Sequence, residues 1–499
     1  MNLRRIALGV VVSVVALSAA CTRTDGSADG EPPALEAIRE DDLRRDLHVL
    51  ASQEMRGREA GTVDEMRASV WLAEQARQAG LEPMGDDGTY FQFWPMRRTR
   101  VSDASRLMLA GTALSIPQDA VLLYPTTARL DAPVVFVGEG KEADLANVDV
   151  RGRIVAAELS HPEGAAPLGP DLSPRRYAMA SVRQRAQFLT EKGAIAVILV
   201  SDSVADGQFQ NIANGWARGS YDVDSGGAPA STRPPVIWVP RRVLSLVRQP
   251  GARLVADIAR ESFVVPSVNV VARAPGSDSA RGEEAVLFSA HQDGLGVRYP
   301  WDGDSIWTGA DDNATTSVAL LAIARAFVQS PAPRSALFVW HGAEEVGLLG
   351  SNYHAEHPVV PIERIVAVLN GDMIGRNHPD TAALLGAQPP HRNSAELARL
   401  ALDANARTTR FVVDSSWDRL EHPEGWYFRS DHLPYARAGI PALFFTTLLH
   451  ADYHTERDDP ERIDVAKLAR MTRWMYETAR LVADGDRRPA RDPEARLER

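Results

Sequence analysis

The chain has 499 residues, 44% of them hydrophobic and 24% charged. At roughly 150 residues per domain this length suggests about three folding units, with enough apolar material for buried cores. The 55 lysines and arginines against 66 aspartates and glutamates give a net charge of −11, and an acidic protein gains nothing from counterion release on nucleic acid, so we expect no nucleic-acid partner. The sequence has no P-loop, no G-x-S-x-G elbow and no H-E-x-x-H motif, which removes local support for those enzyme classes.

The N-terminus has the layout of an export signal. Residues 1–20 combine two arginines with an apolar run from Ile6 to Leu17 that is too short to span a membrane. The segment Leu17-Ser18-Ala19-Ala20-Cys21 resembles a bacterial lipoprotein signal, in which the cysteine is lipidated and becomes the new N-terminus. An ordinary cleaved signal with an incidental cysteine is the alternative. The resemblance implies an exported lipoprotein on a periplasm-facing membrane, the outer membrane in a Gram-negative cell, followed by a flexible tether over residues 21–34.

Cys21 is also the only cysteine of the chain. An intrachain disulfide, a thiolate metal cluster and a Cys-His catalytic pair are therefore excluded.

Two helices are predicted between residues 34 and 80, where apolar residues recur at helical spacing up to Gly80. The glycines of the segment Gly57 to Thr62 predict a turn between them, and we interpret Arg58 in that turn as structural rather than catalytic. Between residues 118 and 262 short β-branched runs, interrupted by one helix near Tyr177 to Gly193, predict a separate, smaller α/β insert.

Strands and helices alternate regularly beyond Phe263. This alternation predicts an α/β fold with a mostly parallel mixed sheet and helices on both faces. The parent unit is expected to comprise residues 35–117 and 263–485, and to close with a helix over Asp464 to Ala483. The Arg-, Pro- and Glu-rich segment 486–499 is predicted to be a disordered tail.

Polar segments follow the predicted strands of this parent unit. Ligands of open α/β sheets lie beyond the carboxyl ends of the strands, so these segments are expected to meet at one edge. Histidine nitrogen with carboxylate oxygen is a ligand set that suits zinc, with cobalt or manganese as alternatives. The segments are His291-Gln292-Asp293, Gly309-Ala310-Asp311-Asp312-Asn313, Gly342-Ala343-Glu344-Glu345, Asn370-Gly371-Asp372-Met373 and Tyr453-His454-Thr455.

The order and spacing of these segments over about residues 262–484 resemble the five motifs of the dizinc aminopeptidase family, which also includes glutamate carboxypeptidase. Ser430-Asp431-His432 adds a sixth family-like segment, and the insert is similar to a protease-associated domain. The resemblance implies a zinc exopeptidase fold with two Zn²⁺ ions. It makes His291 and Asp372 ligands of one metal, Glu345 and His454 ligands of the other, and Asp312 the bridge.

The same resemblance gives roles to residues beside the ligands. It makes Glu344 the general base, gives Asp293 the task of orienting the His291 imidazole, and implies a cis peptide bond after Asp312. It leaves open a one-residue error between Asp311 and Asp312. For Asp431, a place in the substrate site and a helix cap are equal alternatives. We expect His341, His432 and His450 to support the site or lie on the surface.

The function implied is hydrolysis at a peptide terminus, with amino-terminal removal favoured by the resemblance alone. A carboxypeptidase would need an arginine clamp for the terminal carboxylate, for which Arg429 and Arg376 are candidates. Amide chemistry of the glutaminyl-cyclase kind and a non-catalytic binding ectodomain are further alternatives, and the complete ligand set disfavours both. The partners expected are peptide substrates and, through the lipid anchor, a membrane. Neither the preferred terminal residue nor the oligomeric state follows from the sequence.

Overall fold

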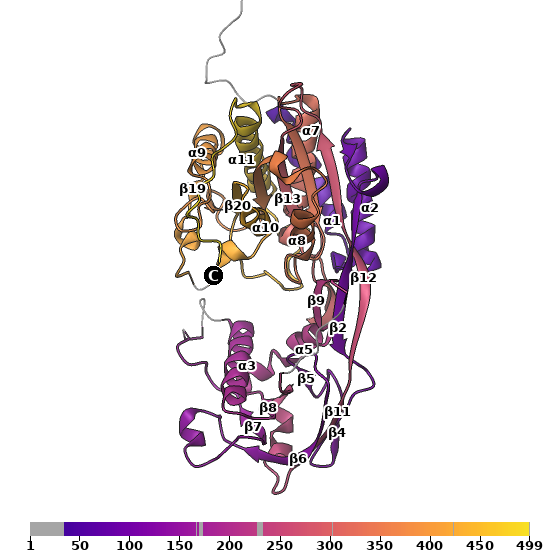
Figure 1. The fold of residues 1–499 in the computed structure, drawn as a ribbon, viewed down its shortest axis with the longest axis vertical. Coiled ribbons are helices and arrows are strands. Elements are labelled where there is room, and N and C mark those ends of the chain that lie inside the picture. Colours follow the sequence, from indigo (N-terminus) through magenta and orange to yellow (C-terminus); the bar gives the residue numbers. More distant parts are fainter. Residues whose placement is uncertain are drawn as a thin grey trace, which may run out of the picture.

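The computed structural model describes residues 34–165, 167–168, 173–226, 233–301, 303–422 and 424–498. The predicted signal, Cys21 and the tether up to residue 33 lie outside this part of the chain. The described residues form two units, one above the other in Figure 1, joined by the long strands β2 and β12 along one side. No helix in the described part is long and apolar enough to cross a membrane.

The larger unit carries the five predicted motifs, and we call it the peptidase unit after the family that those motifs resemble. It is built on a ten-stranded mixed sheet with the order β19-β18-β20-β17-β13-β16-β12-β2-β9, and β1 pairs with β12. Its centre is parallel, because β13 pairs in parallel with β16 and β17, and β17 pairs in parallel with β20. The fold is therefore the α/β class that the alternation predicts. The strands are β1 (Glu82–Pro83), β2 (Phe91–Val101), β9 (Ser220–Val223), β12 (Arg260–Ala274), β13 (Ala285–His291), β16 (Ser335–His341), β17 (Ile365–Gly371), β18 (Thr381–Leu385), β19 (Val412–Val413) and β20 (Ala442–Thr446).

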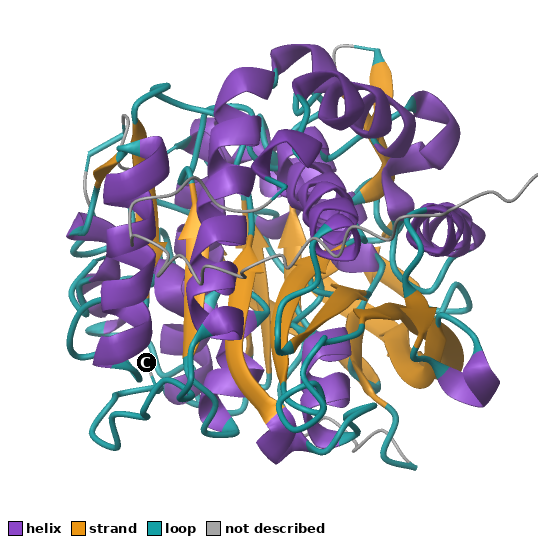
Figure 2. Ribbon diagram, turned by 90° about the horizontal axis from the view of Figure 1, so that it is seen from above, coloured by secondary structure: helices purple, strands orange, loops and turns teal. Residues whose placement is uncertain are grey.

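Helices cover both faces of this sheet (Figure 2). Successive strand residues point to opposite faces, so Val286 and Phe288 of β13 pack with the helices of one face, whereas Leu287 packs in a second core with Tyr435 of the other face. The central strands are buried along their whole length, as expected for a sheet covered twice. The helices are α1 (Glu40–Leu50), α2 (Val63–Gln78), α7 (Thr315–Gln329), α8 (Leu349–Glu356), α9 (Ala395–Ala404), α10 (His432–Arg437) and α11 (Val465–Asp484).

The smaller unit, which we call the insert, has an eight-stranded sheet of its own with the order β4-β3-β11-β6-β7-β8-β10-β5. Its helix α3 packs on one face of the sheet, and α6 belongs to the core on the other. The strands are β3 (Arg106–Leu109), β4 (Thr112–Leu114), β5 (Val121–Leu122), β6 (Ala128–Phe136), β7 (Ile154–Glu158), β8 (Ala196–Val200), β10 (Val236–Val239) and β11 (Arg253–Ile258), and the helices are α3 (Pro174–Glu191), α4 (Ser203–Asp206), α5 (Phe209–Ala217) and α6 (Leu244–Val247).

The insert differs from its prediction in extent. Its sheet includes β3 and β4, so it begins soon after β2 ends at Val101 rather than at residue 118. Three further helices accompany the single one predicted. In addition, β9 leaves the insert and pairs with β2 at the edge of the large sheet. These strands are only three or four residues long, which is too short for a periodic signal in the sequence.

The C-terminal segment also differs from its prediction as a disordered tail. The backbone N–H of Arg496 donates to the carbonyl of Pro390, and Leu497 packs against buried residues of the peptidase unit. The Asp492 carboxylate accepts a hydrogen bond from the Ala395 N–H at 2.9 Å. Composition alone missed these contacts because they are made with surfaces distant in sequence.

Candidate metal centre

The predicted ligands meet at the carboxyl ends of the central parallel strands. His291 is the last residue of β13, Asp372 follows β17 directly, and Glu344 and Glu345 lie in the loop after β16. Asp312 lies in a short turn of π-helix, Ala310–Ala314, that leads into α7, and His454 lies in the loop after β20. The peptide bond between Asp312 and Asn313 is cis, as the sequence resemblance implies.

Two groups of possible metal ligands form there, His291 with Glu344 and Asp372, and Asp312 with Glu345 and His454. The Asp312 carboxylate joins the groups, because its Oδ1 is 3.1 Å from His291 Nε2 and its Oδ2 is 3.1 Å from His454 Nε2. Each imidazole has a second carboxylate close by: Asp372 Oδ1 lies 3.5 Å from His291 Nε2, and Glu345 Oε2 lies 3.0 Å from His454 Nε2. One carboxylate thus faces both imidazoles, the arrangement that a bridging ligand requires.

Three of the converging atoms, His291 Nε2, Asp372 Oδ1 and His454 Nε2, are buried and have no hydrogen-bond partner in the described part of the chain. Buried polar atoms are normally hydrogen-bonded. Their convergence fits divalent cations, which nitrogen and carboxylate oxygen ligands bind together.

The electrostatics of the centre also favour bound cations. Burial raises the pKa of Asp372 to about 6 and raises the pKa of Glu344 well above its usual value. Burial acts in the opposite direction on His291, but the charges of Glu344 and Asp372 outweigh it and raise the pKa of the imidazole. So many carboxylates in one buried place are costly without compensating positive charge, which two divalent cations would supply.

The structure separates Asp312 from its neighbour Asp311. The Asp311 carboxylate accepts the N–H of Gly375 at 2.7 Å and faces His450 Nε2 at 3.4 Å, away from the two ligand groups. Asp458 holds both residues, because its carboxylate accepts the N–H groups of Asp311 and Asp312 at 3.0 Å. Asp312 is therefore the residue in the bridging position.

Asp293 contacts more than the imidazole it is predicted to orient. Its backbone oxygen lies 3.1 Å from His291 Nδ1, closer than its carboxylate at 3.6 Å. The carboxylate accepts the N–H of Glu344 at 3.0 Å and the N–H of Glu345 at 3.3 Å. Asp293 thus holds the His291 ring through its carbonyl and the base-bearing loop through its side chain.

Other polar side chains fix the remaining ligands. Ser430 donates to Asp372 Oδ2 at 2.8 Å and itself accepts from Asn370 at 2.8 Å. Arg58 is fully buried and donates to the carbonyls of Gln292 at 2.7 Å and Gly309 at 2.9 Å. It ties together the loops that carry Asp293 and Asp312, which agrees with its interpretation as structural.

The centre opens into a cavity of about 250 Å³. Its acidic part is formed by Asp312, Glu344, Glu345 and Asp372, and its apolar part by Leu348, Met373, Trp426 and Phe428. Arg429 also lines this cavity, donates to the Tyr453 hydroxyl at 2.9 Å and lies over the Trp426 ring.

The remaining candidates lie near the centre in different roles. Arg376 does not line the cavity and pairs with Asp452 at 2.7 Å. Asp431 precedes α10 without capping it, which removes the cap alternative. Its carboxylate is fully buried, and burial raises its pKa to about 7. His341, His432 and His450 are side chains of the interior rather than of the surface; His341 Nε2, for example, lies 3.2 Å from the Tyr435 hydroxyl.

Sequence reasoning missed Trp426 in the aromatic wall of the cavity and two arginines beside the centre, Arg175 and Arg298, and it gave Tyr453 no role. Tyr453 adjoins the ligand His454, which is a local signal. The others lie in segments that carry no recognisable motif.

The chain is similar in sequence to known peptidases. Residues 269–479 match the sequence model of Peptidase family M28. A probable leucine aminopeptidase of Trichophyton verrucosum is 28% identical over 260 residues, which cover 50% of this chain and 64% of that protein. Leucine aminopeptidase 1 of Trichophyton rubrum is 27% identical over 259 residues, which cover 49% of this chain and 64% of that protein. The chain thus spans less than two thirds of the length of these relatives.

Two solved structures share the fold over nearly the whole chain. An aminopeptidase from Aneurinibacillus sp. strain AM-1 aligns with a TM-score of 0.58 at 19% identity, covering 93% of this chain and 97% of that one. A zinc aminopeptidase from Bacillus subtilis aligns with a TM-score of 0.58 at 18% identity, covering 88% of this chain and 94% of that one. At these identities the likeness shows the fold alone.

Proposed function

We propose that the protein is a zinc-dependent exopeptidase with two metal ions, which removes amino-terminal residues from peptides. The observation that carries the proposal is the Asp312 carboxylate, whose two oxygens each lie 3.1 Å from a different imidazole. His291 and Asp372 would hold one ion, Glu345 and His454 the other, and Asp312 both. The match to Peptidase family M28 and the names of the relatives support the same activity.

Two divalent cations, when bound, supply Lewis acidity and lower the pKa of water. The chain's own residues then carry the proton. Glu344 belongs to the ligand group of His291 and also borders the cavity, where it can accept a proton from the attacking water and return it to the leaving amine. Asp293 keeps Glu344 in place through the hydrogen bond to its backbone N–H. Arg429 and Tyr453, joined by their hydrogen bond, border the space left for the substrate.

The cavity also suggests which terminal residues it takes. Leu348, Met373, Trp426 and Phe428 line the cavity together with the carboxylates and form an apolar wall that suits an apolar side chain. The carboxylates suit the positive charge of a free amino terminus. A carboxypeptidase would instead need a cation at this wall, and Arg429 is held by Tyr453 and by Glu424 at 3.2 Å.

Metal analysis and three substrates test the proposal. We expect close to two zinc ions per chain, and cleavage of leucyl p-nitroanilide but not of its N-acetylated form. Cleavage of an N-blocked dipeptide would establish a carboxypeptidase instead, and cuts within a long unstructured peptide would exclude an exopeptidase. A protein that binds no metal and cleaves none of these would be a binding ectodomain.

We further propose that the insert is a protease-associated-like module that roofs the site, and that the protein is a lipoprotein anchored through Cys21 to a periplasm-facing membrane. The salt bridge between Arg176 of α3 and Glu424 of the peptidase unit supports the first point. The sequence around Cys21 alone supports the second. Cys21→Ser should release the protein into the soluble fraction or leave it unprocessed, and membrane association equal to wild type would contradict the anchor.

A further inference from the structure

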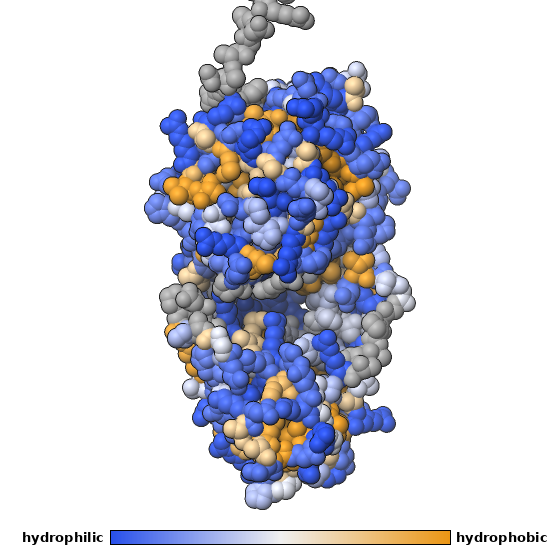
Figure 3. All heavy atoms as spheres, turned by 60° about the vertical axis from the view of Figure 1, so that its left-hand side comes forward, coloured by the Kyte–Doolittle hydropathy of each residue, from blue (hydrophilic) through white to orange (hydrophobic). Residues whose placement is uncertain are grey.

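A second cavity, of about 320 Å³, lies where the insert meets the peptidase unit. The space-filling view shows the molecule hollowed at mid-height between the two units (Figure 3). Glu345 borders both this cavity and the one over the metal centre. A peptide bound at the metal centre therefore has this second cavity next to it.

Both units supply charged side chains to this cavity, and the acidic ones are already engaged. Glu59 is paired with Arg218, Glu345 with His454, and Asp293 accepts two backbone N–H groups. Arg218 is engaged as well, through Glu59 and the carbonyl of Val297. Each of these groups therefore already has a close partner of its own.

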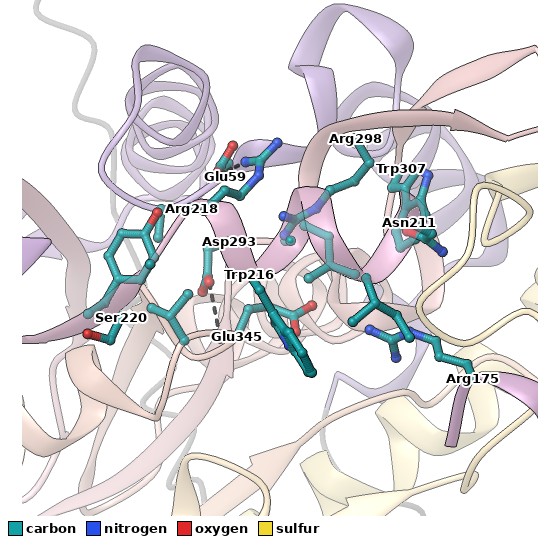
Figure 4. Close-up of a pocket in the computed structure, with 18 residues that line it drawn as sticks. Glu59, Arg175, Asn211, Trp216, Arg218, Ser220, Asp293, Arg298, Trp307 and Glu345 are labelled. Atoms are coloured by element: carbon teal, nitrogen blue, oxygen red, sulfur yellow. Dashed lines mark hydrogen bonds and ion pairs between the residues drawn. The ribbon is translucent and has the colours of Figure 1, made fainter. Parts of the chain in front are cut away.

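Two arginines remain, Arg175 on the first turn of α3 in the insert and Arg298 on β14 (Gly296–Trp301) of the peptidase unit. Figure 4 shows the two side chains entering the cavity from different elements, with Glu345 nearby. Within the described part of the chain neither has an acidic group at ion-pair distance, and Arg175 Nε is buried without a hydrogen-bond partner.

The surroundings of Arg298 also favour an anionic ligand. Burial, together with the neighbouring Arg218 cation, lowers the pKa of Arg298 to about 10, although the carboxylates of Glu59 and Glu345 act against this shift from beyond ion-pair distance; the group is still charged at neutral pH. A half-buried guanidinium without a counter-ion at ion-pair distance is unfavourable. A carboxylate is a suitable partner, because its two oxygens can each accept a hydrogen bond from the planar guanidinium.

We infer that this cavity binds a carboxylate of the peptide substrate between Arg175 and Arg298, so that the enzyme selects peptides carrying a negative charge a short distance from the bond it cleaves. The inference rests on the proposed exopeptidase function. The carboxylate can come from the C-terminus of a short peptide or from an acidic side chain, and the substrates below distinguish the two sources.

Three peptides with the same amino-terminal residue test the inference: leucyl-alanyl-alanine, its C-terminal amide, and the amide of leucyl-alanyl-aspartate. We expect wild type to cleave at least one of the two charged peptides with a kcat/KM about tenfold or more above that of the neutral amide, the size of a charged hydrogen bond. A preference for the first assigns the cavity to a C-terminus, and a preference for the third assigns it to an acidic side chain.

The variants Arg175→Gln and Arg298→Gln keep size and polarity but remove the charge. In each variant we expect the ratio of kcat/KM for the charged peptide to kcat/KM for the neutral amide to fall toward one. The change should arise mainly from a higher KM for the charged peptide, with metal content equal to wild type. Arg129→Gln, at an exposed arginine of the insert, is the matched control and should keep the full preference. Equal cleavage of all three peptides by wild type, or a preference that survives both substitutions, would overturn the inference.

A binding measurement separates this inference from the proposed function. The zinc-loaded Glu344→Gln protein is titrated calorimetrically with the two charged peptides and the neutral amide, because it is expected to bind without turnover. Tighter binding of a charged peptide, lost on adding Arg298→Gln, supports the cavity even if wild type hydrolyses no peptide. Equal affinities would reject it, even if aminoacyl anilides are cleaved.

Discussion

The metal centre and the arginine cavity share Glu345 but are built in opposite ways. The ligands of the centre come from the strand ends of one sheet, and neighbouring polar groups hold them, as Asp458 holds Asp312 and Ser430 holds Asp372. The cavity is lined from two units, and in the described part of the chain neither Arg175 nor Arg298 has a carboxylate at ion-pair distance. Backbone topology thus makes the centre, whereas packing between units makes the cavity.

This difference in construction predicts that variants of the two sites will have different effects. Substitutions in the centre should change metal content or turnover for every substrate, whereas substitutions in the cavity should change the choice among substrates. Each prediction below tests one side of this division.

The largest effect is expected for Asp312→Ala. One carboxylate faces both imidazoles, so we expect loss of both metals and a fall in turnover of about 10³-fold or more, the several kcal/mol that metal catalysis supplies. Atomic absorption and anilide hydrolysis measure the two losses. Asp311→Ala is the control and should retain its metals, because Asp311 faces Gly375 and His450. Equal losses from both variants would refute the bridging assignment.

Glu344→Gln should affect turnover without affecting the metals. Removing a general base costs about 10²- to 10⁴-fold, and the amide keeps the size of the side chain. Glu345→Gln should instead lower metal content, since Glu345 lies 3.0 Å from His454. If Glu344→Gln instead loses metal and Glu345→Gln loses only turnover, the base and the metal ligand are exchanged in our assignment.

Asp458→Asn should weaken metal binding more moderately. Its carboxylate accepts the N–H groups of Asp311 and Asp312, and an amide can accept only one of them well. Residues that orient metal ligands are typically worth about 10- to 100-fold in affinity. Competition with a zinc chelator measures the change. Asp459→Asn, next to it in sequence, should leave the affinity within experimental error.

The smallest effect is expected where the insert touches the peptidase unit. Arg176→Ala removes the bridge to Glu424, but Glu424 keeps Arg429 as a partner. Because the Arg176 side chain is 37% exposed, we expect a loss of less than about 1 kcal/mol in the free energy of unfolding and no loss of metal. Arg399→Ala, at an exposed pair within α9, serves as the comparison in thermal denaturation. A much larger effect of Arg176→Ala would show that this one bridge holds the units together.

The sequence was most informative about the centre because His291, Asp312 and Asp372 adjoin strands or helices with strong patterns. Once the parallel order of β13, β16, β17 and β20 was predicted, their ends had to meet at one edge. The same reasoning could not reach Arg175 and Arg298. No spacing relates a residue of α3 to one of β14, and only the packing of the two units brings them to one cavity.

The predicted boundaries of the insert were wrong for a related reason. β3, β4 and β9 are too short to show a period of two. β3 and β9 also pair with β11 and β2, which are remote in sequence. The prediction of a disordered C-terminal segment rested on composition and was wrong. Its contacts to Pro390 and Ala395 are individual hydrogen bonds, which a hydrophobic pattern does not predict.

The pairing of β9 with β2 has a consequence for engineering by domain exchange. Val101 and Arg260 lie opposite each other where the chain leaves and re-enters the large sheet, and adjacent ends of this kind normally allow a segment to be excised and replaced. Here the excised segment would also contain Ser220–Val223, the outermost strand of the parent sheet. A chimera that omits it would leave β2 as an open edge, prone to pairing with other chains. A successful graft must therefore keep this strand or protect β2 in another way.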